Sequence, residues 1–292
     1  MKRIAIYGEV LEEKHFGFIK AFFELLEKHS FTYWIYDGFK EKLSDIVKFN
    51  GNASVFHTSE ELIENKVECL ISVGGDGTML NSFQFILKSD IYVFGFNTGR
   101  LGFLSNVSTE QLEWAMDELL ADNYSSRNRS VLEINYTGSD APLYAVNEMT
   151  IHKKDTSSML TIHCKIDDDF VNSYWADGVI VTTPTGSTAY SLSCGGPILM
   201  PGSNNFMITP ISPHNLTVRP IVFSDEKAVN LKVESRSDNF LLAMDSSFIT
   251  LSTSQEVVVK KASFSIRLLK FVDYNYFNTL RSKLMWGADK RN

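Results

Sequence analysis

The sequence predicts a two-domain protein, with an α/β domain of the Rossmann-like three-layer type followed by an all-β domain. Its 292 residues are enough for two domains of ordinary size. Up to about residue 125, short apolar runs alternate with helical patterns, which indicates βαβ units and a mostly parallel sheet. Beyond this point helical periodicity almost disappears until the end of the chain. We therefore expect a first domain of residues 1–125 plus about 272–292, and a second of residues 126–271.

The first domain contains four strongly apolar runs and several amphipathic segments. Strands are expected at 2–8, 32–37, 67–73 and 91–96. Two pairs of residues have the spacing of a capping box and predict where helices begin: Thr58 with Glu61, and Ser108 with Gln111. A further helical stretch covers 79–88.

The second domain follows a polar segment, residues 121–130, that we expect to be a linker. Many short strand-like runs then follow, separated by turn signals such as TGSD and SRSD, which is typical of a β-sandwich or a folded sheet. EVVVKK and FSIRLLKF are expected to be two such strands. Residues 276–287 are helical again, and we expect this helix to pack on the first domain.

Composition excludes several classes of protein. The 28 basic and 35 acidic residues give a net charge of −7, which disfavours non-specific binding to nucleic acid. No apolar run is long enough to span a membrane, and the N-terminus does not have the pattern of a signal peptide. Cys69, Cys164 and Cys194 are far apart and lack metal-ligand spacing. We expect a cytoplasmic protein with no disulfide, no membrane partner and no metal-ligating cluster.

A glycine-rich turn is the first candidate site. Gly74-Gly75-Asp76-Gly77-Thr78 stands between an apolar strand and a helix, where glycine allows close approach of a ligand and helix N–H groups attract phosphate. It fits neither of two common phosphate loops, because the third glycine of G-x-G-x-x-G is replaced by Leu80 and no G-K-[ST] follows.

Asp76 is the unusual residue of this turn. A carboxylate repels phosphate, so it is expected to contact a metal, a hydroxyl or a nucleophile. The alternative is a turn aspartate that accepts hydrogen bonds from its own backbone. The turn chemistry alone leaves both possibilities open.

Two further polar features interrupt the second domain. Residues 184–197 contain no Lys, Arg, Asp or Glu and only two large side chains, Tyr190 and Leu192, which favours a ligand-binding loop over a solvated one. Asn147 and Glu148 interrupt an apolar run. They either line a pocket and bind a ribose or base, or one of them simply faces solvent.

In this order, GGDGT, Asn147-Glu148, Asp177-Gly178 and TPTGSTAYSLSCGGPI closely resemble the NAD kinase family. NTGRLGFL (97–104), SPHNLTVRPIVF (212–223), MDSS (244–247) and the terminal YFNTL…KLMW extend the resemblance over nearly the whole chain. The resemblance implies an enzyme that transfers a phosphoryl group from ATP, with Mg²⁺, to the adenosine 2′-hydroxyl of NAD, giving NADP. It also implies a homodimer or homotetramer, with small nucleotides as the only other partners.

The resemblance also implies roles for individual residues. Asp76 is the proton acceptor, and Gly74, Gly75, Gly77 and Thr78 form the phosphate turn. Asn147 and Glu148 match the ribose and adenine contacts, and Asp177 matches a nicotinamide-side contact made across a subunit interface. The remaining expected dinucleotide-binding positions are Thr188, Ala189, Tyr190, Ser191, Leu192, Ser193 and Asp245.

Two positions depart from the family pattern. Trp175 stands where the family often has Arg or His, so stacking is expected to replace a cation, and Ser247 stands where it often has Gln. Arg100, in NTGRLGFL, either reaches a phosphate or is an ordinary surface residue.

Two alternatives to an NAD kinase are considered. One is a GGDG-type kinase acting on a lipid or a sugar, and the other is a non-catalytic dinucleotide sensor. The lack of a membrane-docking segment disfavours a lipid substrate. A carboxylate beside the phosphates would serve no purpose in a sensor.

Overall fold

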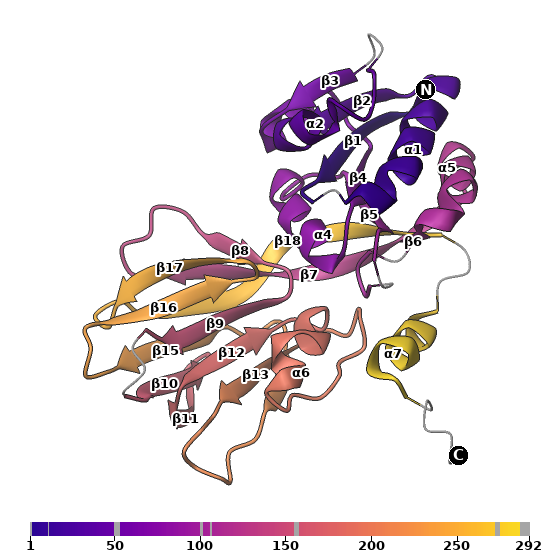
Figure 1. The fold of residues 1–292 in the computed structure, drawn as a ribbon. Helices are drawn as coiled ribbons and strands as arrows, with labels where there is room; N and C mark the ends of the chain where they lie inside the picture. Colours follow the sequence, from indigo (N-terminus) through magenta and orange to yellow (C-terminus); the bar gives the residue numbers. More distant parts are fainter. Residues whose placement is uncertain are drawn as a thin grey trace. The chain divides into compact units, whose positions relative to one another are not determined.

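The computed structural model of the chain describes residues 2–10, 12–49, 53–99, 102–105, 107–154, 158–271 and 275–286. The chain divides into two compact units, residues 1–128 with 266–292 and residues 129–265. The first unit is α/β and the second is rich in β-strands, which confirms the predicted fold class (Figure 1). Within the described residues, no helix has the length and hydropathy needed to cross a bilayer.

The first unit is built on a parallel sheet with the strand order β3-β2-β1-β4-β5. Short β6 and the last part of β18 pair in parallel with β5. The strands are β1 (Arg3–Gly8), β2 (Thr32–Tyr36), β3 (Ala53–Phe56), β4 (Cys69–Val73), β5 (Tyr92–Asn97) and β6 (Val107–Ser108). The helices are α1 (Phe16–Lys28), α2 (Asp37–Leu43), α3 (Ser59–Glu64), α4 (Asp76–Ser82), α5 (Leu112–Leu120) and α7 (Tyr276–Leu284), with 3₁₀ turns η1 (Glu13–His15), η2 (Phe83–Phe85) and η3 (Thr109–Gln111).

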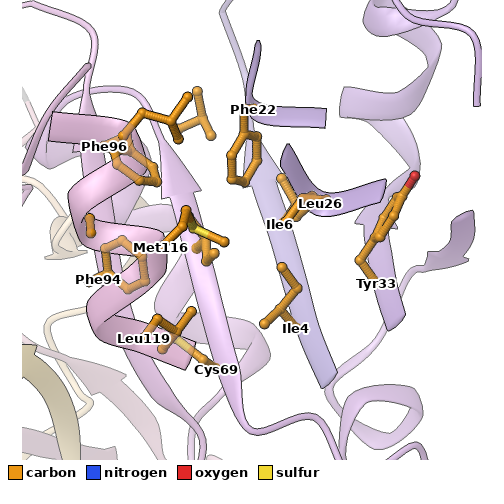
Figure 2. Packing of buried hydrophobic residues seen from close by; sticks show 14 of the residues in the cluster. Ile4, Ile6, Phe22, Leu26, Tyr33, Cys69, Phe94, Phe96, Met116 and Leu119 are labelled. Atoms are coloured by element: carbon orange, nitrogen blue, oxygen red, sulfur yellow. The ribbon is translucent and has the colours of Figure 1, made fainter. Parts of the chain in front are cut away.

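Two amphipathic helices, α1 and α5, pack on the central strands. Figure 2 shows side chains of both helices, among them Phe22 and Met116, against β1, β4 and β5. All the apolar residues on the inner face of α5 are buried, at the helical spacing read from the sequence: Leu112, Ala115, Met116 and Leu119. This burial packs the two helices tightly against the sheet, so the turns at the carboxyl ends of its strands extend from a well-packed core.

The capping signals in the sequence correctly predicted where two helical segments begin. The Thr58 hydroxyl accepts a hydrogen bond from the Glu61 N–H at 3.4 Å, and α3 starts directly after Thr58. Both reciprocal bonds of the capping box are present between Ser108 and Gln111, at the start of η3 and α5. Both capping predictions are confirmed.

The second unit is a pair of antiparallel sheets that enclose one apolar core. One sheet has the order β14-β13-β12-β9-β16-β17, and in the other β11, β10, β15 and the first part of β18 are neighbours, with β7 paired to β8. The bounds are β7 (Tyr124–Tyr136), β8 (Leu143–Ala145), β9 (Glu148–Lys153), β10 (Leu160–Ile166), β11 (Asp169–Ala176), β12 (Gly178–Thr182), β13 (Asn205–Ile211), β14 (Ile221–Ser224), β15 (Val229–Glu234), β16 (Asn239–Met244), β17 (Ser247–Ser252) and β18 (Val257–Phe271). Two short helical turns, η4 (Gly186–Thr188) and α6 (Tyr190–Ser193), lie between β12 and β13.

Three local expectations are wrong. Most of the expected linker, residues 121–130, belongs to β7, a strand whose first residues are mainly polar and only partly covered. The two strands expected from EVVVKK and FSIRLLKF are one strand, β18, through which the chain passes from the second unit to the first. Strand β13 was not expected at all, since Pro210 and the polar residues before it weaken its β pattern.

Candidate nucleotide-binding site

The glycine turn follows β4 and leads directly into α4. Gly74 has φ +155°, and a Cβ there would lie 2.5 Å from Thr78 Oγ1, so the chain's own packing requires glycine. A Cβ on Gly75 or Gly77 would meet nothing within 4 Å. Packing therefore does not explain these two glycines, whereas close approach of a ligand to the backbone would.

Asp76 holds a loop that is distant in sequence. Its Oδ2 accepts a hydrogen bond from the N–H of Phe103 at 2.8 Å, and its Oδ1 accepts from the N–H groups of Leu104 at 3.0 Å and Ser105 at 2.9 Å. A Cβ on Gly102 would lie 1.8 Å from Oδ1, so glycine is required where this loop meets the carboxylate. We did not predict this contact, although GGDGT and NTGRLGFL were both identified as motifs.

The same loop is fixed at its base by side chains. Asn97 Nδ2 donates to the carbonyl oxygen of Ser105 at 3.0 Å, and Asn97 Oδ1 accepts from the N–H of Gly99 at 2.8 Å. Ser105 Oγ donates to the carbonyl oxygen of Gly74 at 3.1 Å, which ties the loop to the glycine turn. Arg100, considered for a phosphate contact, lies outside the described residues.

Asp245 makes an equivalent set of contacts in the second unit. Its Oδ2 accepts from the N–H of Val146 at 2.7 Å, and its Oδ1 accepts from the N–H groups of Asn147 at 2.9 Å and Glu148 at 3.1 Å. Asp245 has φ +47°, in the left-handed region that aspartate tolerates better than most residues. Burial raises the pKa of the Asp245 carboxyl, and the three N–H donors oppose that rise.

Two polar atoms next to this contact have no partner among the described residues. Asn147 Oδ1 and Glu148 Oε2 are buried, and neither has a hydrogen-bond partner among the described residues. Burial, and then the negative charge of Asp245, raise the pKa of Glu148 to about 8. Unsatisfied buried oxygens are uncommon in folded proteins, so both are good candidates for ligand contacts.

Hydroxyls of the serine- and threonine-rich segment, and of the two threonines just before it, form hydrogen bonds inside the chain. Thr182 Oγ1 donates to the carbonyl oxygen of Asn147 at 2.9 Å, and Thr183 Oγ1 donates to that of Val146 at 2.6 Å. The buried Ser191 hydroxyl is 2.7 Å from Thr209 Oγ1. The Thr182 and Thr183 bonds hold the break between β8 and β9, where Asn147 lies.

The other expected contacts in this segment differ in exposure. Thr188, Ala189 and Leu192 are half-buried, whereas Tyr190 and Ser193 are exposed. The structure therefore makes Ser191 part of the support and leaves the Tyr190 ring accessible.

Asp177 and Trp175 lie at the end of β11, and each contacts a side chain from another part of the second unit. Asp177 Oδ1 is 2.6 Å from Lys153 Nζ, in a partly buried ion pair. The Trp175 ring is half exposed, and its centroid is 4.2 Å from that of His214. The pKa of Tyr190 is raised by burial first and then by Cys194 and Asp177.

The sequence of this chain matches two family models. One is the ATP-NAD kinase N-terminal domain, over residues 20–124, and the other is the ATP-NAD kinase C-terminal domain, over residues 146–271. The NAD kinase of Cytophaga hutchinsonii is 41% identical over 294 residues, covering 99% of each chain. That of Bacteroides fragilis is 40% identical over 292 residues, again covering 99% of each.

This chain belongs to the NAD kinase family. Membership identifies it as a phosphotransferase. The same fold occurs in yeast NADH kinase in complex with NADH, with a TM-score of 0.89, 21% identity and coverage of 99% of this chain and 89% of that one. An NAD kinase from Archaeoglobus fulgidus in complex with ATP has a TM-score of 0.73 and 23% identity, covering 97% of this chain and 98% of that one.

Two departures from the family pattern can now be placed. Trp175 packs against the His214 ring and keeps an exposed face, which leaves it able to stack on a ligand. Ser247 is exposed, and its hydroxyl donates to the carbonyl oxygen of Met244 at 3.1 Å.

The contact between Asp76 and its loop gives a first prediction. In Gly102→Ala, the new methyl group would displace the carboxylate, so the amide hydrogens of residues 103–105 should exchange about tenfold to 100-fold faster, as expected for losing hydrogen bonds to a charged group. Hydrogen-exchange mass spectrometry measures this. Gly17→Ala is the control, because a Cβ there meets nothing within 4 Å. Unchanged exchange at 103–105 would show that the loop does not depend on Asp76.

The raised pKa of Glu148 gives a second prediction. Because the pKa of about 8 in the folded state lies above the ordinary value of 4.5 for a glutamate, folding favours the protonated carboxyl. This contribution to stability is complete below about pH 4.5 and is lost as the pH rises through about 8. The free energy of unfolding of the wild type should therefore fall relative to Glu148→Gln across this range. Urea unfolding of both proteins at a series of pH values measures the difference, and a difference independent of pH would contradict it.

Proposed function

We propose that this enzyme transfers the terminal phosphoryl group of ATP to the 2′-hydroxyl of the adenosine ribose of NAD, giving NADP and ADP. The observation that carries the proposal is the Asp76 carboxylate in a glycine turn where a Cβ on Gly75 or Gly77 would meet nothing within 4 Å among the described residues. Oδ1 accepts two N–H groups and Oδ2 only one, so Oδ2 keeps the capacity to accept a hydroxyl proton.

The chemical step uses this free capacity. The 2′-oxygen forms a bond to the γ-phosphorus as the bond from that phosphorus to the β,γ-bridging oxygen breaks, and ADP leaves with the electron pair. The hydroxyl proton passes to Asp76 Oδ2. Because the transition state of phosphoryl transfer is loose, the carboxylate contributes mainly by orienting the hydroxyl and accepts the proton late.

The other expected contacts divide between the two units. In the first, the backbone of Gly74, Gly75, Gly77 and Thr78 binds phosphate. In the second, Asn147 Oδ1 and Glu148 bind the adenosine part of the dinucleotide, since both carry a buried oxygen without a partner in the described chain. Thr188, Ala189, Tyr190, Ser191, Leu192, Ser193, Asp245 and Ser247 support or line that part, and Asp177 with Trp175 contacts the nicotinamide side across a subunit interface.

The divalent ion is expected to arrive with the phosphates. No group of three or more His, Cys, Asp or Glu side chains that could hold an ion is found in the part of the chain that the structure describes. Mg²⁺ does not need such a group, because it commonly binds through one or two carboxylates together with substrate phosphates. When bound, the ion neutralises charge on the phosphates. The cytoplasmic location and the homo-oligomeric state stay predictions from the sequence.

The proposal predicts that the wild type forms NADP from NAD and Mg-ATP, and that Asp76→Asn lowers turnover by about 10²–10⁴-fold. An enzymatic assay for NADP measures turnover, and titration with NAD alone measures binding, which should be retained.

Asp76→Asn also disturbs the loop, because an amide NH₂ would face a backbone N–H. Gly102→Ala is therefore measured beside it, since that variant loosens the loop but keeps the carboxylate. Equal losses of turnover in the two variants would indicate that Asp76 acts only by holding the loop. NAD binding by the wild type without NADP formation, with polyphosphate also tried as donor, would favour a sensor.

A further inference from the structure

The parallel sheet of the first unit has a switch point between β1 and β4. From β1 the chain goes to β2 and β3 on one side, whereas β4 and β5 lie on the other. Ligands of open α/β sheets bind outside the carboxyl ends of the strands at such a point. Gly8 pairs in register with Val73, so the next residues, Glu9 and Gly74, flank this point.

The end of β1 and the loop after β5 adjoin the same strand end. His15 Nε2, six residues after Glu9 in the connection that follows β1, lies 2.7 Å from the carbonyl oxygen of Thr98, in the loop that follows β5. In the sheet β4 lies between β1 and β5, and the glycine turn begins at its carboxyl end. Glu9, directly after β1, thus follows the strand next to the one that leads into the phosphate turn.

The Glu9 carboxylate is oriented but not neutralised. Tyr7 Oη and Asn81 Nδ2 both donate to its Oε1, each at 2.7 Å. Lys42 Nζ donates to the main-chain oxygen of Glu9, and no described cation forms an ion pair with the carboxylate. Two neutral donors therefore hold one oxygen in place and leave Oε2 with its charge available.

The Asp76 carboxylate, on the other side of the switch point, is less available to a ligand than the Glu9 carboxylate. Three backbone N–H groups surround its carboxylate and take up most of its hydrogen-bonding capacity. A free carboxylate such as Glu9 repels phosphate unless a cation lies between them, and Mg²⁺ bound to phosphates readily takes one carboxylate ligand.

We propose that Glu9 is the protein ligand of the divalent ion that accompanies the phosphoryl donor. This role rests on the proposed function, and it concerns binding of the metal–nucleotide complex rather than the proton transfer assigned to Asp76. Tyr7 and Asn81 are positioning residues, because they fix Oε1 so that Oε2 is turned to the ion.

The test compares Glu9→Gln with Glu12→Gln. The first keeps an oxygen for Tyr7 and Asn81 but removes the charge, and the second removes a charge from an exposed residue of the same connection. Binding of Mn²⁺-ADP, followed without turnover by electron paramagnetic resonance, should weaken about tenfold or more in Glu9→Gln. The KM for Mg-ATP should rise in parallel, while NAD binding and the values for Glu12→Gln stay as in the wild type.

Wild-type affinity of Glu9→Gln for Mn²⁺-ADP would overturn the assignment, and so would an equal loss of NAD binding, which would indicate a structural role. A wrong proposed function would be distinguished from a wrong role for Glu9, because the wild type itself would then form no NADP. A smaller loss of Mn²⁺-ADP affinity in Tyr7→Phe, which removes one of the two orienting bonds, would support the positioning role.

Discussion

A single type of contact organises both candidate sites: one aspartate carboxylate that accepts hydrogen bonds from three consecutive backbone N–H groups. Asp76 binds residues 103–105 in this way, and Asp245 binds residues 146–148. Residues 103–105 and 146–147 lie outside strands, and Glu148 is the first residue of β9, so the sheet ladders do not satisfy most of these N–H groups. Leaving one of them buried and unpaired would cost about 1–3 kcal/mol, so each aspartate stabilises a loop that would otherwise be unfavourable.

The geometry of this contact also explains which residues surround it. Three N–H groups converge on one carboxylate only where the backbone comes very close, and at Gly102 a single added carbon would overlap Asp76 Oδ1. In the second unit the chain also approaches closely at Gly186, where a Cβ would lie 2.3 Å from the carbonyl oxygen of Asn147. The glycines of these motifs therefore differ in what requires them. Some permit a close approach within the chain, whereas packing among the described residues does not require Gly75 and Gly77, for which we propose contact with a ligand.

Whether a feature could be predicted depended on how far apart in the sequence its interacting residues lie. The capping pairs at Thr58 and Ser108 and the buried face of α5 were predicted correctly, because each depends on neighbours within one or two turns. The candidate ligand segments rest on residue chemistry and on family resemblance, and their roles stay predictions. Asp76 was expected to face a ligand, but its three N–H partners lie 27 to 29 residues further along the chain. No local pattern contains that contact.

The errors in the second unit have the same origin. Residues 121–130 are polar enough to be a linker, yet pairing with other strands makes most of them part of β7, and one long strand, β18, was expected to be two. Strand partners supply the backbone hydrogen bonds that local propensity cannot reveal. Sequence alone also could not show that Ser191 is buried and hydrogen-bonded to Thr209, whereas Tyr190, one residue earlier, is exposed.

The buried oxygens of Asn147 and Glu148 connect this architecture to function. Asp245 fixes the backbone of both residues, and their side-chain oxygens are buried without a partner among the described residues. The protein without ligand therefore carries the cost of two unsatisfied oxygens, raised further by the negative charge of Asp245 close to Glu148. Under the proposed function, a ligand that forms hydrogen bonds with both side chains removes this cost, whereas one that lacks the matching groups leaves it in place. Selectivity would then follow from a rigid backbone that keeps these polar groups unpaired until a matching ligand binds.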